Sequence, residues 1–437
     1  MLNKSFRVQR VGMWFGLAYI VAETYRYIRF VRTRDLLRKT QTPLSRDFSH
    51  DEWFEFIVCR IRQNPHTFRK LTECIFWNRP YESIDRASIH TCLLTIVSGS
   101  ETHNMDWLIG DKQTIERYQR TVGEIVVDYT PNNPLTPKSN KLLHFIRIDD
   151  PTTNHGQAHP LFRPLPLALV FCGLRYYGNC HLYNCGYSRQ TTRNGFVFWI
   201  RETERRGNTL CFFHGLGFGA IPYMATIERM AKQMNYDNVI FVEMPGISGN
   251  PYIHAKITAQ ETADTICGGI RGYPNIDVIA HSFGTCVLTY IENRYPTFFR
   301  KSVYIDPICF FPVNTKFWPV SCKQMSWCDI ITNPSKMTAI TDFGLSEQYH
   351  QHLIHNSSYM YEFVNREKKM TSDTMILLGG NDNMVSSQEL YEYIRTNYPD
   401  VISHYFEKDR HGAFISKRNQ HYYNTIGEFL TIQKHHE

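Results

Sequence analysis

The sequence predicts an α/β protein with a mostly parallel central sheet that is covered by helices on both faces. From residue 195 onward, short apolar runs alternate with segments of helical periodicity, and this alternation implies parallel strands joined by crossover helices. In addition, the candidate polar residues follow directly after apolar runs. That placement is expected in such sheets, because ligands bind at the carboxyl ends of the strands.

The expected strands are residues 196–201, 210–213, 239–243, 276–280, 302–305, 375–378 and 402–406, and the expected helices are residues 221–234, 285–294 and 388–398. Residues 307–372 lie between two expected strands and are far longer than a usual crossover. We expect them to form a lid over the carboxyl ends of the strands. Their many aromatic residues either suit an apolar acyl substrate or pack the lid on the body.

Composition indicates one large domain plus an additional segment. The chain has 437 residues, of which 42% are hydrophobic, and a mild net charge of +7. Aromatic residues at 14% and charged residues at 20% exclude a disordered chain. Twelve cysteines follow no repeating spacing, and Cys180 and Cys185 have no second pair at zinc-site spacing. Buried free thiols are therefore expected there, and we predict no metal and no cofactor.

The N-terminal part divides into two predicted regions. Residues 1–40 contain the uncharged run Val11–Ala22 between basic clusters, which predicts a membrane-associated helix that binds through apolar and cationic side chains. Twelve residues cannot cross a hydrocarbon core of roughly 30 Å, and a core helix is the alternative. Residues 41–194 have helical periodicity followed by an irregular connection, and residues 195–437 form the predicted α/β domain. A second apolar run, Leu165–Tyr177, is expected to be a helix packed on that domain or on a membrane.

Ser282 has the surroundings of a nucleophile. It stands between the expected strand 276–280 and the expected helix 285–294, with the small residues Ala280 and Gly284 two positions away on either side. A chain that turns this abruptly from strand to helix holds its serine in a strained conformation and needs small neighbours to avoid a collision. We therefore predict that Ser282 is presented at the tip of this turn.

A serine nucleophile needs a base and a group that orients the base. Asp382 follows the expected strand 375–378, and His411 follows the last strand. The chain order serine, aspartate, histidine is typical of one class of hydrolytic sheet protein. Asp306, at the end of the strand before the expected lid, is the rival acid. Asp409 is expected to be a turn residue.

The developing oxyanion needs two backbone N–H donors. One is expected at Phe283, directly after the nucleophile, and the other at Leu216 in the turn His214-Gly-Leu-Gly, with Gly217 as the alternative. A phosphate-binding loop is excluded there, because no Lys-Ser/Thr pair follows and the glycines are wrongly spaced for a dinucleotide loop.

The segments His214-Gly-Leu-Gly, Ala280-His-Ser-Phe-Gly284, Gly380-Asn-Asp382 and His411-Gly together resemble the α/β-hydrolase superfamily. Over most of its length the chain also resembles, more weakly, a group of fungal-type membrane-associated α/β-hydrolases of undefined substrate. The resemblance implies the α/β-hydrolase fold, a serine hydrolase mechanism and the triad Ser282, Asp382 and His411. Ala280 stands where this superfamily usually has glycine, and the change removes no catalytic group.

The predicted function is thus that of a serine hydrolase that cleaves a carboxylic ester, with a small apolar ester or a lipid as its substrate and no nucleic-acid partner. An acyltransferase with the same triad is the nearest alternative, and a catalytically inactive membrane-associated scaffold is another. His350, His352 and His355 lie close together, but no carboxylate or cysteine stands at ligand spacing, so a helix surface is expected. The side of the membrane, the compartment and the oligomeric state stay open.

Overall fold

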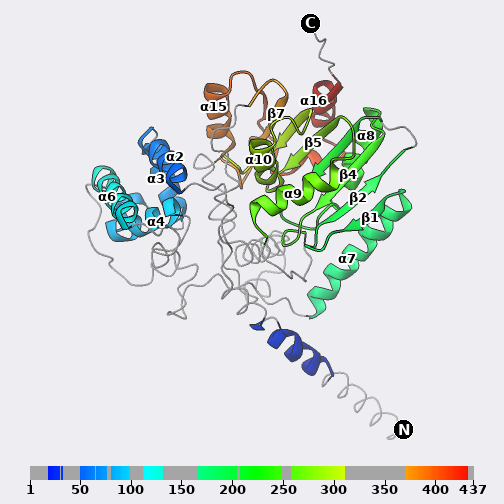
Figure 1. Cartoon of the computed structure of the whole chain (residues 1–437), viewed down its shortest axis with the longest axis horizontal. Coiled ribbons are helices and arrows are strands. Elements are labelled where there is room, and N and C mark those ends of the chain that lie inside the picture. The colour runs from blue at the N-terminus through cyan, green and yellow to red at the C-terminus, as the bar shows by residue number, and fades with distance from the viewer. Residues whose placement is uncertain are drawn as a thin grey trace, which may run out of the picture.

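The computed structural model describes residues 18–29, 31–32, 50–63, 65–75, 80–98, 112–130, 165–203, 207–248, 257–310 and 370–431 (Figure 1). Most of the expected lid, including the three clustered histidines, and residues 11–17 of the expected membrane helix lie outside these ranges. The strands are β1 Ser188–Thr191, β2 Val197–Arg201, β3 Thr209–Phe213, β4 Asn238–Glu243, β5 Ile276–His281, β6 Lys301–Ile305, β7 Thr374–Gly379 and β8 Ile402–Phe406.

The eight strands form one sheet in the order β1-β2-β4-β3-β5-β6-β7-β8. β2 is antiparallel to both of its neighbours, whereas β4, β3 and β5 to β8 are all parallel. The predicted α/β class with a mostly parallel sheet is confirmed. All seven expected strands are present; six of them are largely buried, whereas β8 is a half-buried edge strand.

Helices cover both faces of this sheet, and the side chains of the strands from β2 onward alternate between two cores. One core contains residues of α9 (Ala259–Ile270), α10 (Gly284–Arg294) and α15 (Ser387–Asn397) together with Cys211 and Phe213 of β3. The other contains residues of α7 (Leu165–Asn184), α8 (Met224–Gln233) and α16 (Gln420–Thr431) together with Leu210 and Phe212. With apolar side chains buried on both faces, the sheet is rigid enough to hold groups in fixed positions at the ends of its strands.

Three elements of this architecture, β1, α9 and α16, were not predicted. β1 has the sequence Ser-Arg-Gln-Thr and is exposed throughout, so no apolar alternation marks it, yet it places the start of the sheet before residue 195. α9 begins at a capping box, in which the Thr258 hydroxyl accepts the Glu261 N–H and the Glu261 carboxylate accepts the Thr258 N–H. Two glycines near the end of α9 obscure its periodicity.

A separate helical core lies N-terminal to the sheet (Figure 1). It consists of α2 (His50–Gln63), α3 (Pro65–Ile75), α4 (Arg86–Ser98) and α6 (Lys112–Tyr129). The predicted helical periodicity of this region is therefore confirmed. Two contacts link the cluster to α15, namely the ion pair between Lys70 and Glu389 at 2.7 Å and the Arg60 guanidinium 5.0 Å from the ring centre of Tyr393.

The apolar run that begins at Leu165 forms α7, as expected, and α7 extends to Asn184. None of the described helices is both long enough and apolar enough to cross a bilayer. Cys180 and Cys185, near the end of α7, are free, but the expectation that they are buried is wrong: Cys185 is exposed and Cys180 is half-buried. Cys185 lies one residue beyond the end of α7.

Candidate active site

Ser282 stands at the carboxyl end of β5, in the middle of the sheet. Its φ of 51° lies in the left-handed region, which non-glycine residues rarely adopt. The conformation persists because the Ser282 N–H donates to the carbonyl of Ile305 at 3.0 Å, which continues the hydrogen bonding between β5 and β6. Gly284 is required by contact, since a Cβ there would come within 2.5 Å of the Phe213 carbonyl oxygen. The predicted strand, turn and helix are all present.

The structure brings Ser282, His411 and Asp382 together. Nε2 of His411 is 3.0 Å from the hydroxyl oxygen of Ser282, and Nδ1 is 2.7 Å from Oδ2 of Asp382. The other carboxylate oxygen, Oδ1, accepts the backbone N–H groups of Met384 and Val385 at 2.6 and 2.9 Å. The two backbone N–H groups thus hold one oxygen of the Asp382 carboxylate, and the other oxygen faces the His411 imidazole.

The two other candidate acids have different partners. Asp306 accepts backbone N–H groups from Gly379 and Gly412 and does not bond to either nitrogen of His411. Asp409 pairs with His421 at 2.6 Å. The geometry thus favours Asp382 as the partner of His411.

The turn after β3 lies directly against the serine. A Cβ on Gly215 would come within 2.9 Å of the Ser282 Cβ, so the backbone of this turn borders the hydroxyl. The N–H of Gly217 already donates to the Ile247 carbonyl at 3.0 Å. The N–H of Leu216, in contrast, donates to no other described residue, which favours Leu216 over Gly217 as a donor to a bound oxyanion.

His214 fixes the shape of this turn. The N–H of Met244 donates to Nε2 of His214 at 3.0 Å, so Nδ1 carries the proton and donates to the Gly215 carbonyl at 2.6 Å. Burial lowers the pKa of His214 to about 4, and the positive charge of Arg175 lowers it further, while the Gly215 carbonyl opposes the shift. His214 is therefore a neutral structural link between the ends of β3 and β4.

Two groups at the centre of the site have raised pKa values. Burial raises the pKa of Asp306 to about 6, and the charge of Asp382 adds to this, while His411 and the two backbone N–H donors oppose it. Burial by itself would lower the pKa of His411. The hydrogen bond to Asp382 and the charges of Asp382 and Asp306 outweigh burial, so the pKa of His411 lies above its usual value.

This arrangement can move a proton between a hydroxyl and an imidazole of fixed orientation. His281, Asp306 and His411 also come within 4.8 Å of one another through atoms that could hold a metal ion. Both ring nitrogens of His411 are engaged by Ser282 and Asp382, however, so a metal ion bound there would have to replace one of these hydrogen bonds. Proton transfer is the chemistry that the existing contacts support.

The sequence did not point to a second layer of residues that supports this site. Nδ1 of His281 is 3.0 Å from the Tyr223 hydroxyl, which also accepts the Gly215 N–H at 3.4 Å. His281 directly precedes Ser282, and its ring centre is 5.0 Å from that of His411. The position of His281 beside the serine was a signal, but its partners come from residues distant in the chain.

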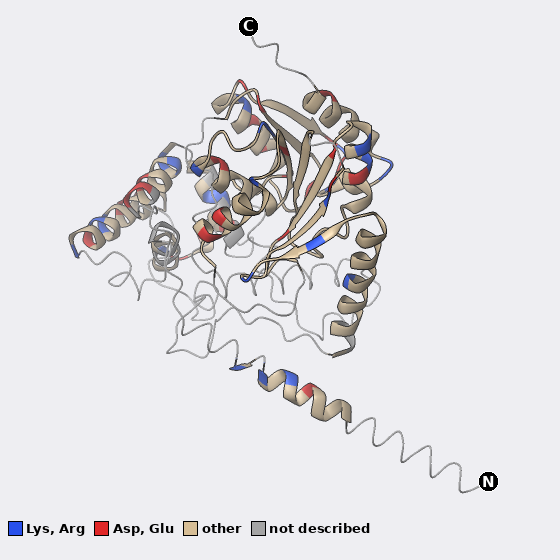
Figure 2. Cartoon of the chain, turned by 45° about the vertical axis from the view of Figure 1, so that its right-hand side comes forward, with Lys and Arg blue, Asp and Glu red and all other residues tan. Residues whose placement is uncertain are grey.

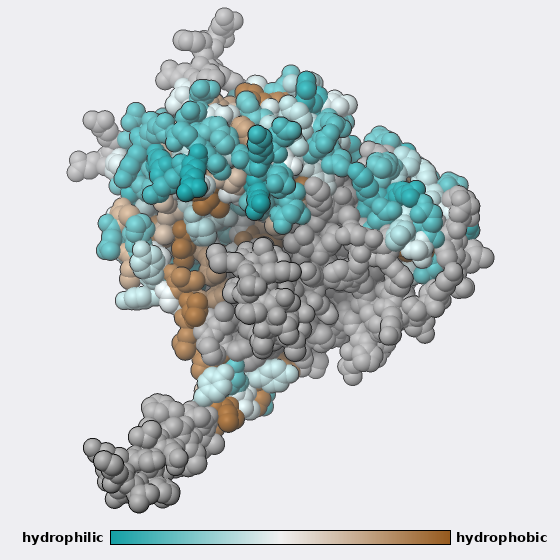
Figure 3. Space-filling view, turned by 180° about the vertical axis from the view of Figure 1, so that it is seen from behind, coloured by the Kyte–Doolittle hydropathy of each residue, from teal (hydrophilic) through white to brown (hydrophobic). Residues whose placement is uncertain are grey.

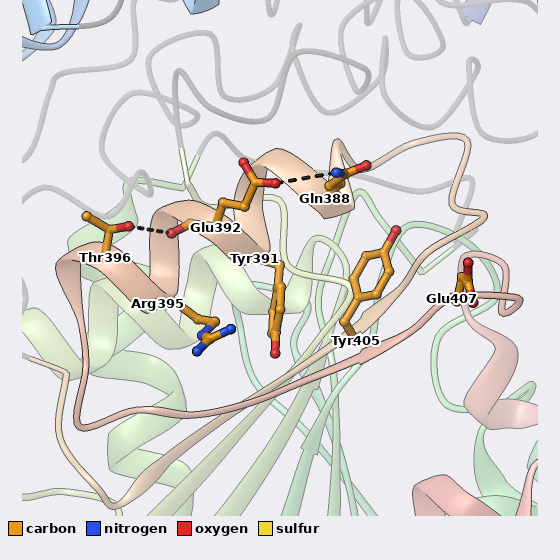
Figure 4. Close-up of a pocket in the computed structure, with 7 residues that line it drawn as sticks. All are labelled: Gln388, Tyr391, Glu392, Arg395, Thr396, Tyr405 and Glu407. Atoms are coloured by element: carbon orange, nitrogen blue, oxygen red, sulfur yellow. Dashed lines mark hydrogen bonds between the residues drawn. The ribbon is translucent and has the colours of Figure 1, made fainter.

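A hollow of about 710 Å³ lies apart from these residues, between α15 and the end of β8 (Figure 4). Its wall is polar, and hydrogen bonds from Gln388 and Thr396 to Glu392 shape one side. None of Ser282, Asp382 and His411 lines it, so we do not assign it to the proposed chemistry. The lining residues are Gln388, Tyr391, Glu392, Arg395, Thr396, Tyr405 and Glu407.

No protein-family model matches the chain, and no curated protein matches it. Among solved structures, the chain is similar to an esterase of Pyrococcus furiosus, at 16% identity over 56% of this chain and 91% of that one, with a TM-score of 0.37. A carboxylesterase of Bacillus subtilis has 13% identity over 60% and 98%, with a TM-score of 0.41. A variant of an epoxide hydrolase of Bacillus megaterium has 14% identity over 56% and 100%, with a TM-score of 0.41. Similarities of this strength do not identify an activity or a substrate.

Proposed function

We propose that this protein is a serine hydrolase that cleaves carboxylic esters, with Ser282 as the nucleophile, His411 as the general base and acid, and Asp382 as the residue that orients His411. The single observation that carries the proposal is the continuous hydrogen bonding from Asp382 through His411 to Ser282, with distances of 2.7 and 3.0 Å. A histidine that is held by a carboxylate and bonded to a serine hydroxyl is the arrangement that activates a weak nucleophile.

The reaction has two halves. In the first, the Ser282 oxygen attacks the ester carbonyl carbon as its proton moves to Nε2 of His411, and the carbonyl π electrons move to oxygen. The C–O bond to the alcohol then breaks, and the alcohol leaves with the proton from His411, which leaves an acyl group on Ser282. In the second half, water attacks the acyl carbon in the same way, and the carboxylic acid and free Ser282 are released.

The negative charge on the carbonyl oxygen needs donors that are in place before the reaction. We assign this role to the backbone N–H groups of Leu216 and Phe283, on the turn after β3 and at the start of α10. Both residues are buried beside Ser282, and in a water-excluded site the loss of one such donor costs about 2.7–4 kcal/mol of transition-state stabilisation. The close approach of Gly215 to Ser282 supports the assignment, since it brings this turn to the serine.

We further propose that the N-terminal part of the chain binds a membrane surface. The helix at residues 18–29 exposes large apolar side chains, with Ile20, Val21 and Tyr25 each 59% to 64% exposed. Arg26 pairs with Glu23 at 2.9 Å, and Arg29 on the same helix can attract anionic headgroups, at about 1 kcal/mol for a basic residue near the surface. Figure 2 shows that this N-terminal helix carries basic residues and projects away from the sheet.

α7 continues this surface. It carries one charged residue, Arg175, and its outer side exposes Leu169, Val170, Tyr176 and Tyr177. The Glu23 carboxylate accepts the Leu165 N–H at 2.9 Å, which joins the two helices. Figure 3 shows hydrophobic side chains gathered along this side of the molecule. An exposed apolar surface of this kind marks an interaction site, and the adjoining arginines favour an anionic lipid surface as the partner.

The same helix contacts the proposed oxyanion turn, which favours a lipid-like substrate. The rings of Phe171 and Phe218 are 4.8 Å apart. Arg175 pairs with Glu243 at 3.2 Å, and Glu243 in turn accepts the Ala220 N–H just after the turn. A substrate that left the bilayer along α7 would therefore arrive next to the proposed site. The more specific likeness to fungal-type membrane-associated hydrolases agrees with this proposal and adds no substrate.

An active-site probe tests the proposal directly. A fluorophosphonate, which phosphonylates activated serines with loss of fluoride, should label the full-length protein and should not label Ser282→Ala. Equal labelling of the two proteins, or no labelling of a folded wild type, would overturn the assignment of Ser282. Absence of labelling together with failure of a broad panel of acyl esters would favour a membrane-associated scaffold without activity. An acyltransferase is separated from a hydrolase by adding an alcohol acceptor and measuring whether ester or free acid is formed.

A further inference from the structure

The carboxylate of Asp306 occupies the centre of the site without contacting the serine. Asp306 follows β6, which lies between β5, where Ser282 stands, and β7, which leads to Asp382. Its side chain is fully buried, and its φ of 45° lies in the left-handed region. A buried carboxylate with a strained backbone is costly to a fold, so its contacts show what the fold gains from it.

Each oxygen of this carboxylate binds a different segment, namely the end of β7 before the Asp382 loop and the loop that carries His411. Oδ1 accepts the N–H of Gly379 at 2.9 Å, three residues before Asp382 in the chain. Oδ2 accepts the N–H of Gly412 at 2.7 Å, directly after His411. The Asp306 carboxylate, directly after β6, therefore holds in position both segments that lead to the contact between Asp382 and the His411 imidazole.

The two loops are also joined to each other, by the hydrogen bond between His411 and Asp382 and by two backbone hydrogen bonds. The N–H of Gly380 donates to the Phe406 carbonyl, and the N–H of Asn381 donates to the Asp409 carbonyl, both at 2.8 Å. These bonds join the two loops to each other but not to the strand ends at Ser282 and Asp306. The Asp306 carboxylate joins both segments to the end of β6, next to the strand that leads to Ser282.

We propose that Asp306 is the positioning residue of this site, which keeps His411 and Asp382 in line with Ser282 by binding the Gly379 and Gly412 N–H groups, and which acts on the protonation of His411 through its charge. The expected effect on the rate of reaction at Ser282 rests on the proposed function. The positioning itself concerns hydrogen bonds that exist whether or not Ser282 reacts.

Asp306 also acts on His411 electrostatically. The titratable groups around the imidazole come from every element packed against it. His281 on β5 is held neutral, because burial first and a positive charge on His411 second lower its pKa. Burial likewise raises the pKa of Tyr223 and Tyr422, which therefore stay neutral. The charges that remain beside His411 are those of Asp382 and Asp306, so removing the second should lower the pKa of His411.

The test compares Asp306→Asn with Asp277→Asn, a matched control. Asp277 is equally buried and lies on β5, but at the opposite end of the sheet, where it pairs with Arg300 and Tyr236. The rate of fluorophosphonate labelling is measured against pH, and labelling requires neutral His411. In the pH profile of the labelling rate, we expect the maximal rate (the plateau) of Asp306→Asn to be at least tenfold lower than that of the wild type. The part of the profile where the rate falls in acid (the acid limb) should shift to lower pH. Asp277→Asn should lose stability but keep the plateau and limb of the wild type.

A labelling profile for Asp306→Asn that matches the wild type would overturn the proposal. The variant Asp306→Glu keeps the charge and displaces it by one methylene, so it should keep the wild-type limb and still lose rate. A shift of the limb in Asp306→Glu as large as that in Asp306→Asn would refute the role of the charge.

A measurement on the wild type covers the case in which the variants do not fold or Ser282 does not react. The amide protons of Gly379 and Gly412 should exchange with solvent at least 100-fold more slowly than exposed backbone amides, and their NMR shifts should follow one titration, that of Asp306. Fast exchange at either glycine, or shifts that do not titrate together, would overturn the positioning role. This result does not depend on whether the protein hydrolyses esters.

Discussion

Gly215 and Ser282 approach each other so closely that a methyl group on Gly215 would lie 2.9 Å from the Cβ of Ser282. Real Cβ atoms do not tolerate this distance, so any larger residue would push the turn after β3 away from the serine. The same methyl group would also come within 3.1 Å of Nδ1 of His281. Because Gly215 has no side chain, the turn after β3 can lie close to Ser282. This closeness would allow a backbone N–H of the turn to reach an oxyanion bound beside the Ser282 hydroxyl.

Gly215→Ala should therefore impair the proposed chemistry without unfolding the protein. We expect the rate of probe labelling to fall about 100-fold, which corresponds to the displacement of one oxyanion donor. Gly427→Ala on α16 is the control, because nothing lies within 4 Å of a Cβ built there. Its labelling rate should equal that of the wild type, and a Gly215→Ala variant that is labelled as fast would contradict the proposed oxyanion site.

The acid is tested by replacing a carboxylate with an amide. Asp382→Asn would hold His411 in the wrong tautomer, and in a serine protease such a change costs about 10⁴-fold in turnover. We expect a loss of this order for Asp382→Asn and a much smaller loss for Asp306→Asn. Asp409→Asn, whose partner is His421, should be close to wild type in ester hydrolysis. A greater loss in Asp306→Asn than in Asp382→Asn would move the orienting acid to Asp306.

Because the backbone of Ser282 is strained, glycine should stabilise the fold more than alanine at this position, whereas at an ordinary position alanine should be the more stabilising of the two. At a φ of 51° a Cβ is unfavourable, so Ser282→Gly should be more stable than Ser282→Ala by about 1 kcal/mol. Ser386 has an ordinary φ of −77°, and there the glycine variant should be the less stable of the two. Urea denaturation of the four variants checks both orders. The same order at both positions would show that Ser282 is not strained in solution.

His214 should make the fold sensitive to acid. The pKa of His214 is about 4 in the folded protein and about 6.5 in the unfolded chain. Between these values the unfolded chain binds a proton that the folded protein excludes, so its stabilising contribution is complete above pH 6.5 and is lost as the pH falls to 4. The loss amounts to about 3 kcal/mol. Urea denaturation from pH 7 to pH 4 should give a flatter curve for His214→Gln than for the wild type, and parallel curves would refute the assignment.

The membrane proposal is tested by flotation with vesicles of phosphatidylcholine and phosphatidylserine. Replacing Leu169 and Val170 on α7 with serine should lower the bound fraction at least tenfold, because each large apolar side chain contributes about 1.5–3 kcal/mol when it leaves water. Val127→Ser on α6 is the control, since Val127 is 60% exposed and Val170 is 57% exposed. High salt should weaken binding, as expected for arginine attraction. Wild-type protein that does not float, or equal binding by all variants, would overturn the proposal.

The sequence by itself determined seven of the eight strands of the sheet and which residue types follow them. The strands in the middle of the sheet are apolar on both faces, so they were visible as continuous apolar runs, and small residues around Ser282 marked the sharp turn. The order of Ser282, Asp382 and His411 was equally plain. β1 was missed because an exposed edge strand needs no apolar pattern to pair with its neighbour.

Only the tertiary structure decided which of these groups touch. Ser282 and His411 are 129 residues apart in the chain, and their contact depends on where two loops end rather than on any local preference. For the same reason the sequence left Asp306 as a rival acid and Gly217 as an alternative donor. Both follow strands in the expected way, but the Gly217 N–H is taken by Ile247 and the oxygens of Asp306 by Gly379 and Gly412. Local patterns determine strands and turns, whereas hydrogen-bond partners across strand ends follow from the packing of the whole sheet.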